Sequence, residues 1–229
     1  MKAFLLAAGL GTRLRPLTNE TPKCLIPIKG KPLLVYWIEL MTVHGINEVL
    51  INLHYLPNTV KSFIENYPTS DISFTLFEEP TLLGSAGTLK ANKDFVANEE
   101  NFFILYADNL TNINLTELLN FHKKKEHFFT MALNRVSNPS ICGIATLDEN
   151  DTITSFIEKP QLPTSNLANA GVYVAKPEVL NFIPSKNVVD IGFDLLPQLV
   201  GKMAGWETSD LLIDIGTFDN LRLAEKIWT

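Results

Sequence analysis

Short apolar runs alternate with segments of helical periodicity through the first half of the chain. Phe102–Tyr106 is apolar throughout and Glu48–Leu53 almost so, which is typical of strands buried on both faces. Between such runs, Leu34, Trp37 and Met41 recur at the spacing of one helix face. This strand–helix–strand order predicts a parallel sheet with helices on both faces and right-handed crossovers.

From about residue 135 onward the apolar runs shorten and helical patterns become rarer. The runs 143–147 and 153–157 flank the polar turn Asp148-Glu-Asn-Asp151, which is the pattern of a β-hairpin. We therefore expect a single domain over 1–229 with three parts: a parallel-sheet half over 1–134, a small and mostly antiparallel lid over 135–185, and a C-terminal part over 186–229.

Composition narrows the class of protein. Of the 229 residues, 46% are hydrophobic, which is enough for a sizeable core, and the formal net charge is -6. A negative net charge argues against a general nucleic-acid or membrane-surface binder, so basic groups that meet a ligand must be local. The N-terminal apolar run is too short for a signal peptide and no run is long enough to cross a bilayer, so we expect a cytoplasmic protein.

Small residues and cations follow the first predicted strand, Ala3–Leu6. The segment 7–11 contains a single bulky residue, so its backbone can approach a ligand and point N–H groups at it. Arg13, Arg15 and Lys23 come next and add positive charge. A glycine loop that leaves a strand and is followed by cations is a way of holding a polyphosphate.

Two well-characterised glycine loops do not match this segment. The dinucleotide fingerprint requires Gly or Ala at its last position, where this chain has Leu14. The ATPase loop requires Gly-Lys-Ser/Thr at its end, which this segment lacks. The remaining alternative, a tight turn with solvated arginines, explains the glycines but leaves the run of cations unexplained.

A carboxylate stands just beyond the buried run Phe102–Tyr106. Asp108 is expected at the same sheet edge as the glycine loop, because both follow strands of a parallel sheet. A carboxylate beside phosphates is destabilised unless a cation lies between them, and Mg²⁺ accepts oxygen ligands from both. The alternative is that Asp108 caps a helix or forms a turn.

At this point the chain resembles a known family. The stretch AAGLGTRLRPLT followed by PKCLIPIKGKPLL is similar to the signature of sugar-1-phosphate nucleotidylyltransferases, although Cys24 stands where the usual form has Pro. The resemblance touches residues 1–40, 78–110, 140–175 and 190–225. It implies a Rossmann-like α/β fold: a mixed, mainly parallel sheet flanked by helices, with a small, mostly antiparallel sugar-binding lid. It also implies Mg²⁺-dependent transfer of a nucleotidyl group from a nucleoside triphosphate to a sugar 1-phosphate.

The resemblance assigns roles to residues that match the family's motifs. It implies catalytic roles for Arg13, Lys23 and Lys159, and Mg²⁺ ligation by Asp108 and Asp214. It implies nucleotide binding by Leu6, Ala7, Ala8, Gly9, Gly11, Thr12, Arg13, Lys23, Gly84, Ser85, Ala86 and Gly87. It implies sugar-phosphate binding by Asn109, Gly143, Glu158, Lys159 and Asn169.

Asp108 and Asp214 both follow apolar runs, and neither has a basic neighbour in sequence. We therefore expect the two carboxylates to share one Mg²⁺ and to repel each other when it is absent. On this expectation, changing either aspartate to asparagine leaves the metal-free protein as stable as before or more stable.

The identity of the base rests on the segment 78–88. Its Leu-Gly84-Ser-Ala-Gly87 order resembles the loop of guanylyltransferases that act on mannose- or heptose-type phosphates, with Ser85 in place of the common Thr. The segment contains no Gln, which uracil- and thymine-specific relatives usually carry before this glycine. GTP is therefore the favoured triphosphate, with backbone groups of the small-residue loop reading the base. The structural alternative is a helix whose N-terminus is capped by Ser85.

Two other functions remain open from the sequence. One is a uridylyl-, thymidylyl- or cytidylyltransferase acting on another sugar phosphate or on phosphocholine. The other is a catalytically inactive subunit that binds a nucleotide-sugar, although the presence of Lys23, Asp108 and Asp214 favours an enzyme. No nucleic-acid or membrane partner is expected, and a homodimer formed through the lid fits this reading.

Overall fold

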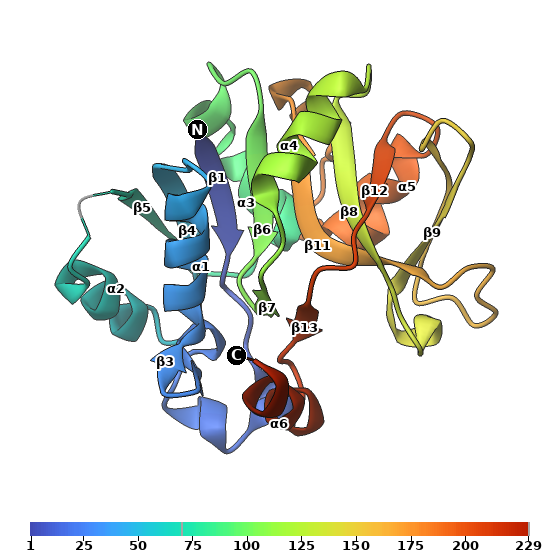
Figure 1. The fold of residues 1–229 in the computed structure, drawn as a ribbon. Helices are drawn as coiled ribbons and strands as arrows, with labels where there is room; N and C mark the ends of the chain where they lie inside the picture. The colour runs from blue at the N-terminus through green and yellow to red at the C-terminus, as the bar shows by residue number, and fades with distance from the viewer. Residues whose placement is uncertain (70, 229) are drawn as a thin grey trace. The chain divides into compact units, whose positions relative to one another are not determined.

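The computed structural model describes residues 1–69 and 71–228. Two compact units make up the chain (Figure 1). The first unit consists of Met1–Leu82, Leu105–Ile113 and Leu211–Thr229, and the second consists of Leu83–Ile104 and Asn114–Asp210.

The first unit contains a parallel ladder of three strands, in the order β1 (Lys2–Leu6), β4 (Glu48–Leu53) and β5 (Ser73–Glu78). Residues 3–5 of β1 and 49–53 of β4 are buried. Parallel strands place their carboxyl ends at one edge. The glycine loop that leaves β1 and the segment that follows β4 therefore begin at the same edge of this sheet.

The helix α1 (Leu33–Val43) precedes β4 in the chain. Leu34, Trp37 and Met41 are buried as their spacing predicts. Gly45, with φ +70°, allows the chain to turn away just beyond the helix. The short strands β2 (Pro27–Ile28) and β3 (Lys31–Pro32) pair just before α1, and α2 (Pro57–Asn66) connects β4 to β5.

A second pairing in the first unit joins segments that are far apart in sequence. The antiparallel strands β7 (Asn109–Thr111) and β13 (Leu212–Asp214) place Asp214 opposite Asn109 (Figure 1). Beyond β13, the helix α6 (Phe218–Ile227) begins after Thr217, whose Oγ1 accepts the N–H of Asn220 at 3.2 Å. This cap fixes the path of the chain immediately after Asp214.

The second unit is built on a mainly antiparallel sheet. Its strands follow the order β10 (Ile153–Glu158), β9 (Gly143–Leu147), β11 (Leu167–Ala175), β8 (Phe129–Arg135) and β12 (Ala204–Glu207). Only β12 and β8 run parallel among these pairs of described strands. The predicted hairpin is confirmed: Asp148 Oδ1 accepts the N–H groups of Asn150 and Thr152 and so closes the turn between β9 and β10.

Helices flank this sheet. The helix α4 (Leu115–Lys124) contacts β8, β11 and β12. The strand β6 (Phe102–Tyr106) has its first three residues in the second unit and its last two in the first, and it is buried along 102–105 as predicted. The remaining helical segments are α3 (Ser85–Ala91), α5 (Leu196–Leu199), the π-helix η7 (Ile191–Leu195) and the 3₁₀ turns η1 (Thr12–Leu14), η2 (Leu17–Asn19), η3 (Lys23–Leu25), η4 (Lys93–Val96), η5 (Pro139–Ile141) and η6 (Pro177–Phe182).

The parallel ladder, the antiparallel strands and the flanking helices confirm the predicted mixed α/β class. The predicted boundaries at residues 134 and 185 stay predictions. In the second unit, which joins Leu83–Ile104 to Asn114–Asp210, the N–H groups of Ala86 and Gly87 both donate to the carbonyl of Val189. No helix among residues 1–69 and 71–228 is both long and apolar enough to cross a bilayer.

A buried polar network on α4 makes stability depend on pH. His122 lies between Asn101 and Thr130 in the second unit. Its Nε2 is 2.9 Å from Asn101 Oδ1, which can only accept, so Nε2 carries the proton and Nδ1 accepts from the Thr130 hydroxyl at 2.8 Å. Burial lowers the pKa of His122 from 6.5 to about 4, with a smaller contribution from Lys176.

We expect the free energy of unfolding to fall as pH drops below 6.5, because the unfolded chain then binds a proton that folded His122 does not bind until about pH 4. At about pH 5 this linkage removes about 2 kcal/mol relative to about pH 7.5. Urea unfolding at the two pH values measures the difference, and His122→Gln, which does not titrate, should reduce it by that amount. Equal pH dependence of variant and wild type would contradict the prediction.

Candidate active site

Three charged side chains of the first unit meet at one point. The Nζ of Lys23, on η3, lies 2.6 Å from Asp108 Oδ2 and 3.0 Å from Asp214 Oδ1. The Lys23 side chain is 8% exposed, whereas the two carboxylates are 39% and 45% exposed. One nearly buried ammonium group thus holds two carboxylates that remain open to solvent.

The pairing of β7 with β13 brings the two aspartates together. Asp214 ends β13 opposite Asn109, and Asp108 immediately precedes Asn109. The N–H of Ile215 donates to the carbonyl of Asp108 at 3.0 Å, which extends the contact by one residue. Backbone hydrogen bonds therefore fix two carboxylates that lie 106 positions apart in sequence.

Gly216 leaves the space that this cluster occupies. A Cβ at this position would lie 2.6 Å from Arg13 Nη2, 2.8 Å from Asp214 Oδ1 and 3.0 Å from Lys23 Nζ. Arg13 Nη2 is also 3.7 Å from Asp214 Oδ2. The predicted catalytic cations Arg13 and Lys23 and the predicted metal ligands Asp108 and Asp214 thus form one cluster, which we call the Lys23 cluster.

This arrangement corrects one expectation. Asp108 and Asp214 have no basic neighbour in sequence, but each is paired with Lys23 in the folded chain. The expectation of two unpaired carboxylates that repel each other in the metal-free protein is therefore wrong, and we no longer expect either asparagine variant to be more stable. Removing a carboxylate here removes an ion pair.

The donor set of the Lys23 cluster suits a divalent cation held partly by substrate. Among the described residues, no three His, Cys, Asp or Glu side chains gather into a metal-binding group. Two carboxylates do converge on one positive charge, and both are partly exposed. Mg²⁺ commonly takes one or two protein carboxylates and completes its coordination with substrate phosphates and water. Asp108 and Asp214 therefore fit a magnesium ion that a nucleotide would help to hold.

The glycine loop is anchored where it leaves β1. The N–H of Ala107 donates to the carbonyl of Leu6 at 3.1 Å, and the N–H of Ala7 donates to Asn52 Oδ1 at 2.7 Å. Asn52 in turn donates to Glu79 Oε1 at 2.8 Å, and both side chains are buried. Asn52 escaped the sequence analysis, although a polar residue inside the apolar run of β4 was a signal. These bonds engage the carbonyl of Leu6 and the N–H of Ala7 within the protein.

The other positions of the glycine loop are either exposed or packed against neighbouring residues. A Cβ at Gly9 would meet no heavy atom within 4 Å in the described part of the chain, and Gly9 is exposed. Gly11 has φ +62°, and a Cβ there would lie 2.8 Å from Thr18 Cγ2. Ala8 is buried, and Thr12 begins η1. Gly11 is therefore required by the turn, whereas Gly9 keeps the backbone accessible.

The second unit contains the other glycine loop. Gly84 has φ +79°, and a Cβ there would lie 2.4 Å from the carbonyl oxygen of Val189. Ala86 and Gly87 donate their N–H groups to that same oxygen at 2.9 and 3.0 Å. These two N–H groups are used within the protein, so they are not the groups that would read a base.

Ser85 does not cap α3 as the structural alternative expected. The helix begins at Ser85 itself, and its N-cap residue is Gly84. The Ser85 hydroxyl donates instead to Asp190 Oδ2 at 2.9 Å and accepts the N–H of Ile191 at 2.7 Å. Asp190 is a residue that the sequence analysis missed.

Glu158 lies in a cradle formed by two glycines. A Cβ at Gly143, on β9, would lie 2.5 Å from Glu158 Oε2, and one at Gly192, on η7, would lie 2.6 Å from it. Burial raises the pKa of Glu158, Lys159 lowers it, and Asp190 raises it. The structure thus brings together Gly143 and Glu158, two of the predicted sugar-site residues, and adds Gly192.

A repeated tripeptide was the available signal for Gly192. Asp190-Ile-Gly192 has the same order as Asp214-Ile-Gly216, and in both places the glycine makes room for a carboxylate. The Lys159 side chain is exposed, and its Nζ lies 5.8 Å from the centre of the Phe193 ring.

The two predicted asparagines are held by the protein. Asn169 Nδ2 donates to the Tyr173 hydroxyl at 2.7 Å, and its Oδ1 accepts the N–H of Gly171 at 3.0 Å. These bonds span an irregularity in the pairing of β11 with β8. Asn109 is 6% exposed and belongs to β7 in the first unit, where it lies opposite Asp214.

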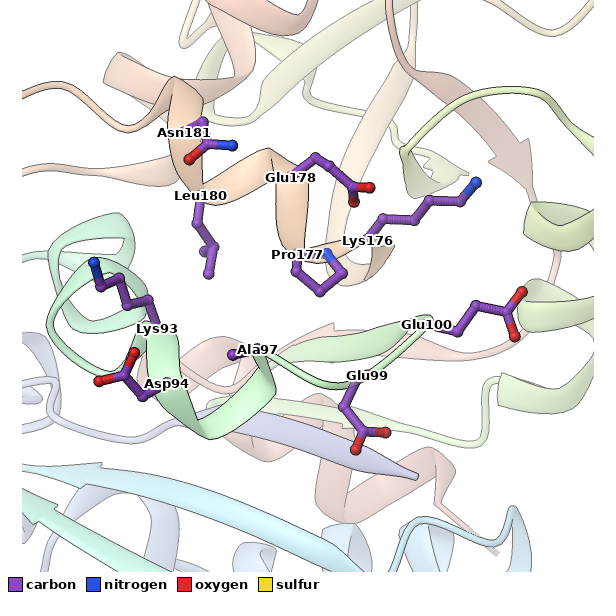
Figure 2. Close-up of a pocket in the computed structure, with 10 residues that line it drawn as sticks. All are labelled: Lys93, Asp94, Ala97, Glu99, Glu100, Lys176, Pro177, Glu178, Leu180 and Asn181. Atoms are coloured by element: carbon purple, nitrogen blue, oxygen red, sulfur yellow. The ribbon is translucent and has the colours of Figure 1, made fainter.

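A hollow of about 660 Å³ lies elsewhere on the second unit, between η4 and η6 (Figure 2). Among the described residues that line it there are four carboxylates and two ammonium groups, and none of the predicted site residues. The lining consists of Lys93, Asp94, Ala97, Glu99, Glu100, Lys176, Pro177, Glu178, Leu180 and Asn181.

Comparison with known proteins identifies the family of this chain. The family model described as nucleotidyl transferase matches residues 2–228. The UTP–glucose-1-phosphate uridylyltransferase of Synechocystis sp. is 33% identical over 214 residues, which cover 87% of this chain and 55% of that protein. Mannose-1-phosphate guanylyltransferase 1 of Arabidopsis thaliana is 35% identical over 187 residues, covering 80% and 52% respectively. The chain spans about half the length of the curated relatives it matches.

Solved structures agree on the fold. HddC from Yersinia pseudotuberculosis superposes with a TM-score of 0.83 at 21% identity, covering 100% of this chain and 99% of that one. A UDP-glucose pyrophosphorylase from Acinetobacter baumanii superposes with a TM-score of 0.81 at 19% identity, covering 98% and 91%. At these identities the likeness concerns the fold alone, and it agrees with the predicted class.

Proposed function

Because the chain belongs to the nucleotidyl transferase family, we propose that it transfers a nucleotidyl group from a nucleoside triphosphate to a sugar 1-phosphate. An oxygen of the sugar phosphate forms a bond to the α-phosphorus, the bond from that phosphorus to the β-phosphate oxygen breaks, and pyrophosphate leaves. The observation that carries the proposal is the Lys23 cluster, where two cations and two carboxylates converge beside the glycine loop of the first unit. The names of the curated relatives support the same reaction class.

The proposed reaction depends mainly on how charged groups are placed and stabilised. The attacking phosphate is already an anion, so no general base is needed. The barrier comes from bringing two anions together and from the charge that accumulates on the α-phosphate and the leaving group, so positioning and electrostatic stabilisation should dominate. In this proposal Lys23 neutralises the α-phosphate, and Arg13 together with the open backbone near Gly9 holds the β- and γ-phosphates.

Asp108 and Asp214 would hold a magnesium ion. When bound, Mg²⁺ supplies positive charge to the phosphate oxygens and neutralises the two carboxylates. Lys23 would keep its ammonium group close to both carboxylates and hence close to the phosphates. Glu158 would accept hydrogen bonds from sugar hydroxyls, and Lys159 would pair with the sugar phosphate.

Guanine is the favoured base, on the likeness of the segment 78–88 to guanylyltransferase loops. Curated relatives include both guanylyl- and uridylyltransferases, so a uridylyl-, thymidylyl- or cytidylyltransferase is the second candidate. Because Ala86 and Gly87 donate their N–H groups to Val189, base reading falls to other groups of this loop. We further expect the protein to be in the cytoplasm, where nucleoside triphosphates are abundant. A homodimer stays a prediction.

Pyrophosphate release tests the proposal. Purified protein is assayed with GTP, UTP, dTTP, CTP and ATP against mannose, glucose and heptose 1-phosphates and phosphocholine, with Mg²⁺ present. We expect turnover to require a sugar 1-phosphate and to be fastest with GTP. Faster turnover with another triphosphate would show that guanine is not the preferred base. Turnover with phosphocholine would show that the acceptor is not a sugar 1-phosphate. Nucleotide-sugar binding without turnover on any pair would favour an inactive subunit.

The variant Lys159→Ala tests whether Lys159 acts on the sugar 1-phosphate and not on the triphosphate. Lys159 is exposed, so we expect the fold to be retained and the KM for the sugar 1-phosphate to rise about tenfold, with the KM for the triphosphate nearly unchanged. Initial rates at varied concentrations of each substrate measure both values. Lys202→Ala, which removes another exposed lysine of the second unit, is the matched control. Equal increases in both KM values would show that Lys159 does not act on the sugar phosphate.

A further inference from the structure

The start of α3 is joined to the segment 189–191 by side-chain hydrogen bonds as well as by the backbone. Ser85 Oγ donates to Asp190 Oδ2 at 2.9 Å and accepts the N–H of Ile191 at 2.7 Å. A hydroxyl that donates to a carboxylate makes a charge-assisted bond, which is stronger than a neutral one. Ser85 therefore fixes the beginning of η7 (Ile191–Leu195) to the glycine loop.

Asp190 uses its second oxygen to fix the same segment from the other side. Its Oδ1 accepts the N–H of Phe193 at 3.1 Å, which caps the π-helix, and its own N–H donates to Asp194 Oδ2 at 2.8 Å. Both carboxylate oxygens of Asp190 are thus engaged, one by the glycine loop and one by η7. The position of residues 191–193 follows from these bonds.

Gly192 lies inside that fixed segment and against Glu158. A Cβ at Gly192 would lie 2.6 Å from Glu158 Oε2 and 3.1 Å from its Cδ, so the backbone of η7 forms one wall of the space that holds the carboxylate. Gly143 also borders this space, because a Cβ there would lie 2.5 Å from the same oxygen. A small shift of η7 changes the room available to Glu158 directly.

We propose that Ser85 and Asp190 are positioning residues: their hydrogen bond holds Gly192 against Glu158 and so links the glycine loop 84–87 to the carboxylate that binds the sugar. The inference rests on the proposed function, in which the loop serves the nucleotide and Glu158 serves the sugar 1-phosphate. Its distinctive consequence is that a change at Ser85, in the loop assigned to the nucleotide, weakens binding of the sugar 1-phosphate.

The first test is kinetic. Ser85→Ala removes both hydrogen bonds, and we expect it to raise the KM for the sugar 1-phosphate about tenfold. Ser85→Thr keeps the hydroxyl and should stay within about twofold of wild type. Ser62→Ala, an exposed serine on α2, is the matched control. A rise confined to the KM for the triphosphate would overturn the proposal, as would equal losses in every parameter with no rescue by threonine.

A double-mutant cycle tests whether Ser85 acts through Gly192. Gly192→Ala should by itself raise the KM for the sugar 1-phosphate, because its Cβ displaces the Glu158 carboxylate. If both residues act through the position of η7, adding Ser85→Ala to Gly192→Ala should raise that KM by less than about twofold further. Full multiplication of the two effects would show independent actions and overturn the link.

Hydrogen exchange distinguishes a failure of this inference from a failure of the proposed function. In substrate-free protein, Ser85→Ala should speed amide exchange at Ile191–Leu195 about tenfold or more, while exchange in β8 stays unchanged. Unchanged exchange at Ile191–Leu195 would refute the positioning role whatever the enzyme's activity. Faster exchange in a protein that turns over no sugar phosphate would support the positioning role and refute the proposed function instead.

Discussion

Replacing Lys23 with alanine should lower kcat about a thousandfold, because its positive charge is needed most when charge accumulates on the α-phosphate. The side chain is 8% exposed and its Nζ contacts Asp108 and Asp214 at 2.6 and 3.0 Å, so its position is fixed before substrate binds. An ammonium group held in place needs little reorganisation during the reaction. The KM for the triphosphate should change much less than kcat does.

Steady-state kinetics with the best substrate pair measure both parameters. Lys23→Arg, which keeps the charge but changes its shape, should recover part of the lost rate. Lys31→Ala is the control, because Lys31 forms a surface ion pair with Glu39 outside the Lys23 cluster. A Lys23→Ala enzyme with a kcat within about threefold of wild type would remove Lys23 from the catalytic machinery.

Changing either Asp108 or Asp214 to asparagine should abolish most turnover and remove the Mg²⁺ dependence of triphosphate binding. A neutral amide is a poorer magnesium ligand than a carboxylate, and each variant leaves one carboxylate to hold the ion. Asp214 Oδ1 accepts the N–H of Gly216 at 2.8 Å, and the amide oxygen introduced by Asp214→Asn can accept the same bond, so the local turn should persist. The expected loss of kcat is about a hundredfold or more, on the order of that for other groups that stabilise phosphoryl charge.

Calorimetric titration of the triphosphate with and without Mg²⁺ is the measurement that decides. Asp219→Asn, whose side chain is 93% exposed on the neighbouring helix α6, is the matched control. Thermal unfolding of the metal-free variants should show a small loss of stability, at most about 1 kcal/mol, because each ion pair with Lys23 is partly exposed. An aspartate whose asparagine variant keeps wild-type Mg²⁺ dependence is not a ligand.

Local pattern was sufficient for most secondary structure. Strands β4, β6 and β9 have the bounds expected from their apolar runs. Buried runs and helical spacing are local properties, because the chain must hide the same side chains whatever its partners are. The motifs that carry the resemblance also lie in short stretches, which is why Arg13, Lys23, Asp108 and Glu158 could be named from the sequence.

Local patterns did not predict the hydrogen bonds between residues far apart in sequence, or the glycines that make room for distant side chains. Ser85 is the first residue of α3, and its hydroxyl donates to Asp190, which lies 105 positions later. Backbone groups of the loop 84–87 were expected to read the base, but the N–H groups of Ala86 and Gly87 both donate to the carbonyl of Val189. A polar group forms a hydrogen bond with a partner that the fold brings within about 3 Å. The order of residues along the chain does not give that distance.

Local sequence patterns predicted the α/β class, several of the strands and helices, and the residue types that point to phosphate chemistry. Which charges pair in the Lys23 cluster depends on the fold, because the pairing of β7 with β13 brings Asp214 beside Asp108 and η3 presents Lys23 to both. Electrostatic energy depends on separation in space, so two carboxylates without basic neighbours in sequence can still both pair with one ammonium group. That contact reverses the expected effect of removing either carboxylate on the stability of the metal-free protein.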